Sequence, residues 1–135
     1  MSRAKDLVVE DEWLVGHHIK LTLEDLGYAV VGLTGSGDEA LQLATEHLPE
    51  LVLMDISLEG DMDGIEAAEK INQQLEVPVV FLTAFSDPQA LGISKGATSY
   101  GFIMKPFETQ DLYYAIENAL QQSWSENCPE NLDRL

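Results

Sequence analysis

The stretch PELVLMDISLEGDMDGIEAAEKINQQLEVPVVFLTAF, residues 49–85, contains the alternation that decides the fold class of this chain. An apolar run at 51–54 is followed by a longer segment in which Ile65, Ala68 and Ile71 recur at helical spacing, and a second apolar run occupies 79–82. A short strand, an amphipathic helix and another short strand form a βαβ unit, whose two strands are parallel. Strands covered by helices on both faces are apolar at nearly every position, as both runs are here. The stretch therefore predicts an α/β protein with a parallel sheet.

The same alternation continues from this stretch toward both ends of the chain. Gly27 and Pro49 end the first two helices, because Gly27 can adopt the left-handed cap conformation and the residue before a proline disfavours helix. Five successive βα units predict a flavodoxin-like (βα)5 fold, a doubly wound five-stranded parallel sheet with strand order 2-1-3-4-5. The expected strands are residues 6–9, 28–33, 51–54, 79–82 and 100–104, and the expected helices are 13–26, about 36–48, 64–75, 87–95 and 109–123.

Length and composition limit what the chain can be. The 135 residues are 45% hydrophobic, which suffices for one globular domain, expected at residues 1–123, with a polar tail at 124–135. A formal net charge of −17 repels nucleic-acid phosphates and excludes nucleic acid as a partner. No apolar run approaches the roughly 20 residues that cross a bilayer, so we expect a cytoplasmic protein without a membrane span. The only cysteine, Cys128, cannot form an internal disulfide.

Acidic residues follow two of the predicted strands. Glu10 and Asp11 come directly after the first strand, and Asp55 directly after the third. In the expected strand order these two strands are neighbours, so Asp11 and Asp55 face each other across one strand spacing of about 5 Å. Carboxylates at that separation repel each other unless a cation lies between them. Sparse oxygen ligands with room for water suit Mg²⁺ better than zinc, so the sequence predicts a magnesium site.

Two further polar residues follow the fourth and fifth predicted strands. Thr83 follows the fourth strand and Lys105 the fifth. An ammonium group opposite the metal would neutralise a second side of a phosphoryl group, and a hydroxyl would donate to one of its oxygens. The metal, the lysine and the threonine together predict a phosphoryl-binding crevice at this edge of the sheet.

With these residues in place, the chain resembles the receiver domain of two-component response regulators over residues 6 to about 123. The spacing of the matching segments agrees throughout. The segments are LVVEDE (7–12), GYAVVGLTGSGDEAL (27–41), PELVLMDISLEGDMDGIEAA (49–68), PVVFLTAF (78–85) and YGFIMKPF (100–107).

The resemblance implies a role for each matching residue. Asp55 would be the phosphate acceptor and, with Asp11 and the backbone carbonyl of Ser57, would ligate Mg²⁺. Glu10 would hold the ion through water. Thr83 and Lys105 would contact the phosphoryl group, Thr83 and Phe102 would form the switch pair, and the Lys105–Pro106 peptide would be cis.

The resemblance also implies partners. A sensor histidine kinase or a phosphotransfer protein would supply the phosphoryl group from a phosphohistidine, and a downstream effector protein would bind the face built by the fourth helix, fifth strand and fifth helix. A phosphorylation-dependent homodimer is a further expectation. Such a domain is no enzyme toward other substrates, since it catalyses only its own phosphorylation and dephosphorylation.

Two departures from the usual receiver pattern affect these expectations. The loop between Asp55 and Gly64 is one residue longer than usual, with Leu58 to Asp61 in place of a common Met-Pro. Phe102 lacks the hydroxyl of the commoner tyrosine, so a switch can act only through burial of its ring.

Two other functions are compatible with parts of the sequence. A small Mg²⁺-dependent phosphatase also starts from an aspartate after a strand, but its second acid, two positions on, is Ser57 here. The segment Gly35-Ser36-Gly37-Asp38-Glu39-Ala40 fits the dinucleotide-binding spacing G-x-G-x-x-A. It follows the second strand instead of the first, however, and the chain is too short to add a substrate domain, which argues against dinucleotide binding.

Overall fold

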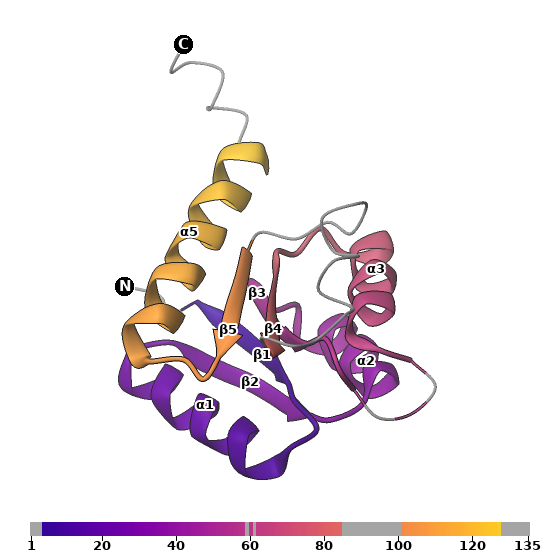
Figure 1. Cartoon of the computed structure of the whole chain (residues 1–135). Helices are drawn as coiled ribbons and strands as arrows, with labels where there is room; N and C mark the ends of the chain where they lie inside the picture. The colour runs from indigo at the N-terminus through magenta and orange to yellow at the C-terminus, as the bar shows by residue number, and fades with distance from the viewer. Residues whose placement is uncertain (1–3, 59, 61, 85–100, 128–135) are drawn as a thin grey trace.

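We describe the protein from a computed structural model, shown in Figure 1. The structure describes residues 4–58, 60, 62–84 and 101–127, without the side chains of residues 84 and 123–127. The helix predicted at 87–95 and residues 128–135 of the predicted tail lie outside this part of the chain.

The described residues form five strands and four helices, which alternate along the chain except that β5 is the next described element after β4. The five strands make one parallel sheet in the order β2-β1-β3-β4-β5, which confirms the predicted fold class and strand order. The strands are β1 (Lys5–Val9), β2 (Ala29–Thr34), β3 (Leu51–Asp55), β4 (Val79–Ala84) and β5 (Gly101–Lys105), and the helices are α1 (Trp13–Asp25), α2 (Gly37–His47), α3 (Gly64–Gln74) and α5 (Thr109–Asn127).

The sheet separates two apolar cores, and successive side chains of a strand enter opposite ones. In β1, Leu7 and Val9 pack with α2 and α3, whereas Val8 packs with α1 and α5. Figure 1 shows these helix pairs on opposite sides of the sheet. Because both faces are covered, all five residues of β3 are buried, which explains the continuous apolar run in the sequence.

The ends of the helices follow local signals. Ser36 caps α2 by accepting a hydrogen bond from the backbone N–H of Glu39, and Asp63 caps α3 by accepting one from that of Glu66. Gly27, just after α1, has a φ of 100° that favours glycine. The last helix continues to Asn127 instead of ending at about Ser123.

Within the described residues, no helix is both long and apolar enough to cross a membrane.

Candidate metal centre at the carboxyl ends of the strands

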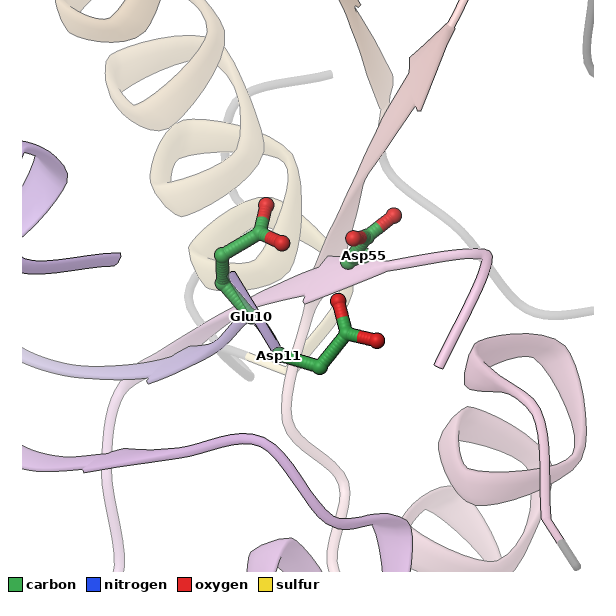
Figure 2. Close-up of side chains that lie close together, drawn as sticks. All are labelled: Glu10, Asp11 and Asp55. Atoms are coloured by element: carbon green, nitrogen blue, oxygen red, sulfur yellow. The ribbon is translucent and has the colours of Figure 1, made fainter. Parts of the chain in front are cut away.

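Three carboxylates predicted from the sequence meet at one edge of the sheet. Glu10 and Asp11 follow β1, and Asp55 is the last residue of the neighbouring strand β3. Each offers an oxygen within 4.8 Å of the others. Figure 2 shows the three side chains reaching into the same region from these two adjacent strands. Glu10 and Asp55 are buried and Asp11 is half-buried, so the cluster combines three negative charges with limited access to water.

Lys105, at the end of β5, reaches across β4 to this cluster. Its Nζ lies 2.7 Å from Oε1 of Glu10 and 3.3 Å from Oδ2 of Asp55. The Lys105–Pro106 peptide that follows is cis, as the resemblance implies. The ammonium therefore contacts the proposed acceptor carboxylate directly and pairs with Glu10 at the same time.

The protonation equilibria of Glu10 and Lys105 reflect this arrangement. Burial, together with the neighbouring Asp55, raises the pKa of Glu10 above its ordinary value, although the hydrogen bond from Lys105 acts in the opposite direction. Burial acts to lower the pKa of Lys105, but its hydrogen bond to Glu10 and the charge of Asp55 outweigh burial and leave the pKa raised. Lys105 is thus a permanent cation in this cluster.

The chemistry of the donor set fits Mg²⁺. All three side chains offer carboxylate oxygens, and one ammonium cannot neutralise three carboxylates. Both oxygens of Glu10 already accept hydrogen bonds, Oε1 from Lys105 and Oε2 from the backbone N–H of Glu12 at 3.1 Å. Both oxygens of Asp55 also accept hydrogen bonds, from Ser57 and Lys105, so these contacts do not rank the carboxylates. The roles of Asp11 and Asp55 as direct ligands, and of Glu10 as a ligand through water, stay predictions.

Ser57 and Thr83 lie beside Asp55, at positions that suit their predicted roles. The backbone N–H of Ser57 donates to Oδ1 of Asp55 at 3.1 Å, which helps to fix the orientation of the carboxylate. Thr83 is buried in β4, one residue beyond Leu82, the register partner of Asp55. The contribution of the Ser57 carbonyl to metal binding and of the Thr83 hydroxyl to phosphoryl binding stay predictions.

Phe102, the predicted switch aromatic, is 49% exposed in β5. Its ring centroid lies 6.4 Å from that of buried Phe81, and the two ring planes are inclined by 28°. Phe102 therefore packs against Phe81 while about half of its surface is exposed to solvent.

Sequence reasoning missed a glycine beside Asp55. A Cβ atom at Gly64 would lie 2.0 Å from the carbonyl oxygen of Asp55, so any side chain there would displace α3 or the end of β3. The N–H of Gly64 donates to the carbonyl of Ile56 at 2.9 Å, which holds the first turn of α3 against this strand end. The sequence signal was a glycine between the capping Asp63 and the first apolar residue of the helix.

Comparison with known proteins agrees with this geometry. Residues 7–117 match the family model of the response regulator receiver domain. The transcriptional regulatory protein PdtaR of Mycobacterium tuberculosis is 39% identical over 116 residues, which are 86% of this chain and 56% of that protein. The chain thus spans about half the length of this curated relative.

Solved structures that are similar to this chain are also receiver domains. The signal receiver domain of a modulated diguanylate cyclase from Desulfovibrio desulfuricans G20 has a TM-score of 0.87 and 31% identity, covering 93% of this chain and 100% of that one. A CheY-like response regulator receiver domain protein from Methanospirillum hungatei JF-1 has a TM-score of 0.83 and 28% identity, with the same two coverages of 93% and 100%.

Proposed function

The chain belongs to the response regulator receiver domain family, and from this premise we propose that Asp55 accepts a phosphoryl group from a phosphohistidine in a Mg²⁺-dependent reaction. The donor is a sensor histidine kinase or a phosphotransfer protein, and the reaction takes place in the cytoplasm. The observation that carries the proposal is the contact of Asp55 Oδ2 with Lys105 Nζ at 3.3 Å inside a cluster that also holds Asp11.

The chemical step needs one nucleophile and several charge-stabilising groups. An Asp55 carboxylate oxygen attacks the phosphorus in line, the new P–O bond forms as the P–N bond to imidazole breaks, and the released imidazole nitrogen takes up a proton from solvent. Mg²⁺ bound by Asp11, Asp55 and the Ser57 carbonyl, with Glu10 behind a water, would neutralise charge on the phosphoryl oxygens. Lys105, which already contacts Asp55, pairs with the phosphoryl oxygens during the transfer, and Thr83 donates a hydrogen bond from its hydroxyl to one of them.

Phosphorylation changes the binding of a partner by shifting the population between two conformations of the domain, which differ in how their side chains pack. The new charge draws the Thr83 hydroxyl toward Asp55, and the vacated space lets the Phe102 ring turn inward beside Phe81. Exposed apolar and aromatic side chains on β5 and α5 make this region suitable for a downstream effector or for a second phosphorylated copy. They are Phe102, Met104, Tyr113 and Tyr114.

The proposal is tested by incubating the protein with acetyl phosphate and Mg²⁺ and measuring its intact mass. A gain of about 80 Da, the mass of HPO₃, is expected for the wild type and not for Asp55→Asn. Once acetyl phosphate is removed, phosphate release should stop after the adduct is consumed, since the chain is no enzyme toward other substrates. Identical spectra for the wild type and Asp55→Asn, or sustained turnover of an added phosphate ester, would refute the proposed function.

A further inference from the structure

We propose that Gly35 is a positioning residue for the metal ligand Asp11, because its missing side chain lets the loop between β2 and α2 pack directly on the Asp11 backbone. The inference rests on the proposed function, in which Asp11 binds Mg²⁺. Gly35 is the first glycine of the G-x-G-x-x-A segment, whose spacing fits a dinucleotide-binding loop, and the inference assigns this glycine a different role.

The contact between Gly35 and Asp11 leaves no room for a methyl group. A Cβ atom at Gly35 would lie 2.9 Å from Cα and 3.3 Å from Cβ of Asp11, and 3.5 Å from the carbonyl oxygen of Glu10. The nearest of these atoms belongs to the backbone and cannot move aside by rotation of a side chain. An alanine at Gly35 must therefore displace either the loop or Asp11.

The loop is held too firmly to be the part that moves. The N–H of Glu10 donates to the carbonyl oxygen of Thr34 at 2.8 Å, which ties the end of β2 to the metal-ligand segment. The Thr34 hydroxyl donates to the carboxylate of Glu39 and accepts from the N–H of Ser36 at 3.2 Å. Ser36 in turn caps α2 through the N–H of Glu39 at 3.3 Å. An added methyl group consequently shifts Asp11 away from the other carboxylates.

A conformational reason for glycine does not apply at this position. Among the described glycines, a positive φ is found at Gly27, Gly60 and Gly101, and Gly35 is not one of them. The second glycine of the segment, Gly37, makes a close approach of its own, since a Cβ there would lie 3.0 Å from the sulfur of Met62. The requirement at Gly35 is therefore steric and is directed at Asp11.

The experiment compares Mg²⁺ binding by Gly35→Ala with that of a matched variant, Gly32→Ala. Gly32 lies in β2, three residues before Gly35. A Cβ atom there would be equally tight, 3.0 Å from Cδ1 of Leu7 and 3.2 Å from Cδ1 of Leu43, but these atoms are the ends of flexible apolar side chains. Isothermal titration calorimetry with MgCl₂ alone gives the dissociation constant, and thermal unfolding in EDTA gives the stability of each metal-free variant.

We expect Gly35→Ala to raise the Mg²⁺ dissociation constant about tenfold or more, as changes around a ligand commonly do, while Gly32→Ala stays within about twofold of the wild type. Both variants are expected to unfold at lower temperature than the wild type in EDTA. A folded Gly35→Ala that binds Mg²⁺ as tightly as Gly32→Ala overturns the positioning role.

Thr34→Val keeps the glycine and removes the hydroxyl that holds the loop, so it tests the inference even if Gly35→Ala does not fold. A dissociation constant raised by more than about threefold supports the role of the loop, and an unchanged constant overturns it. If the wild type itself neither binds Mg²⁺ nor forms the adduct, the proposed function fails together with the inference. Normal wild-type binding with unaffected variants overturns the inference alone.

Discussion

The ammonium nitrogen of Lys105 lies 2.7 Å from Oε1 of Glu10, although 95 positions separate the two residues in the chain. The Glu10 side chain has 0% solvent exposure, whereas that of Lys105 keeps 22%. A buried carboxylate without a counterion is costly, so Lys105 stabilises the folded protein in addition to its proposed contact with the phosphoryl group.

Replacing this ammonium should destabilise the protein in a pH-dependent way. Lys105→Met is expected to lower the free energy of unfolding by about 2 kcal/mol at pH 7.5, because Glu10 is then buried without a cation. The loss should shrink at pH 5.5, where Glu10, whose pKa burial already raises, takes up a proton and becomes neutral. Urea denaturation at the two pH values measures both effects.

The matched control is Lys70→Met. Lys70 Nζ lies 3.9 Å from Oε2 of Glu66, and the two side chains are 45% and 53% exposed, so its loss should change stability by less than about 0.5 kcal/mol. Equal losses for the two lysine variants would show that the Lys105–Glu10 pair is no more important than a surface pair.

Mg²⁺ should stabilise the wild type and have a smaller effect on Asp11→Asn. At a concentration ten times the dissociation constant, the ion is expected to add about 1.4 kcal/mol to the free energy of unfolding. In EDTA, where no ion is bound, Asp11→Asn should be more stable than the wild type, because one of three mutually repelling carboxylates is gone. Thermal unfolding with and without the ion measures this, and the same Mg²⁺ response in both proteins would rule out Asp11 as a ligand.

The sequence predicted which residues lie at this edge of the sheet, but not how their side chains contact one another. Apolar runs locate β1, β3, β4 and β5, and the polar residue that ends each run follows from the rule for parallel sheets. Nothing in a linear pattern says that Lys105 pairs with Glu10, because that depends on how far a side chain reaches across the sheet. The apolar stripe of α5 ends at Leu120, so the pattern could not predict its continuation to Asn127. The close approach of Gly35 to Asp11 likewise appears only when the loop is folded.

Burial of Asp6, near the start of β1, should make the protein less stable as the pH rises. The residue is 0% exposed, and within the described part of the chain neither of its carboxylate oxygens has a hydrogen-bond partner. Burial, followed by the charges of Glu50 and Glu117, raises its pKa from an ordinary 3.8 to about 8. The folded state thus keeps a proton that the unfolded chain loses near pH 4, and the free energy of unfolding falls between about pH 4 and pH 8.

Asp6→Asn removes this titration without changing the shape of the side chain. The variant should be more stable than the wild type at pH 8.5, by about 2 kcal/mol, and its stability should depend less on pH between 4 and 8. Asp25→Asn, at the exposed end of α1, serves as the control for loss of one carboxylate and should not raise the stability at pH 8.5 by a comparable amount. Urea denaturation curves collected across this range measure the slope, and parallel profiles for the wild type and Asp6→Asn would contradict the assignment.

A hydrogen bond from Tyr28 to Glu117 fixes α5 to the residues that precede β2. The Tyr28 hydroxyl donates to Oε2 of Glu117, and burial together with this carboxylate raises the tyrosine pKa, so the hydroxyl stays protonated and remains a donor. Tyr28→Phe keeps the buried ring and removes the donor, and is expected to lower the free energy of unfolding by about 1–2 kcal/mol. Tyr114→Phe, on the same helix with a side chain that is 62% exposed, should cost less than about 0.5 kcal/mol. Urea midpoints that fall equally in both variants would mean that this hydrogen bond does not hold α5 in place.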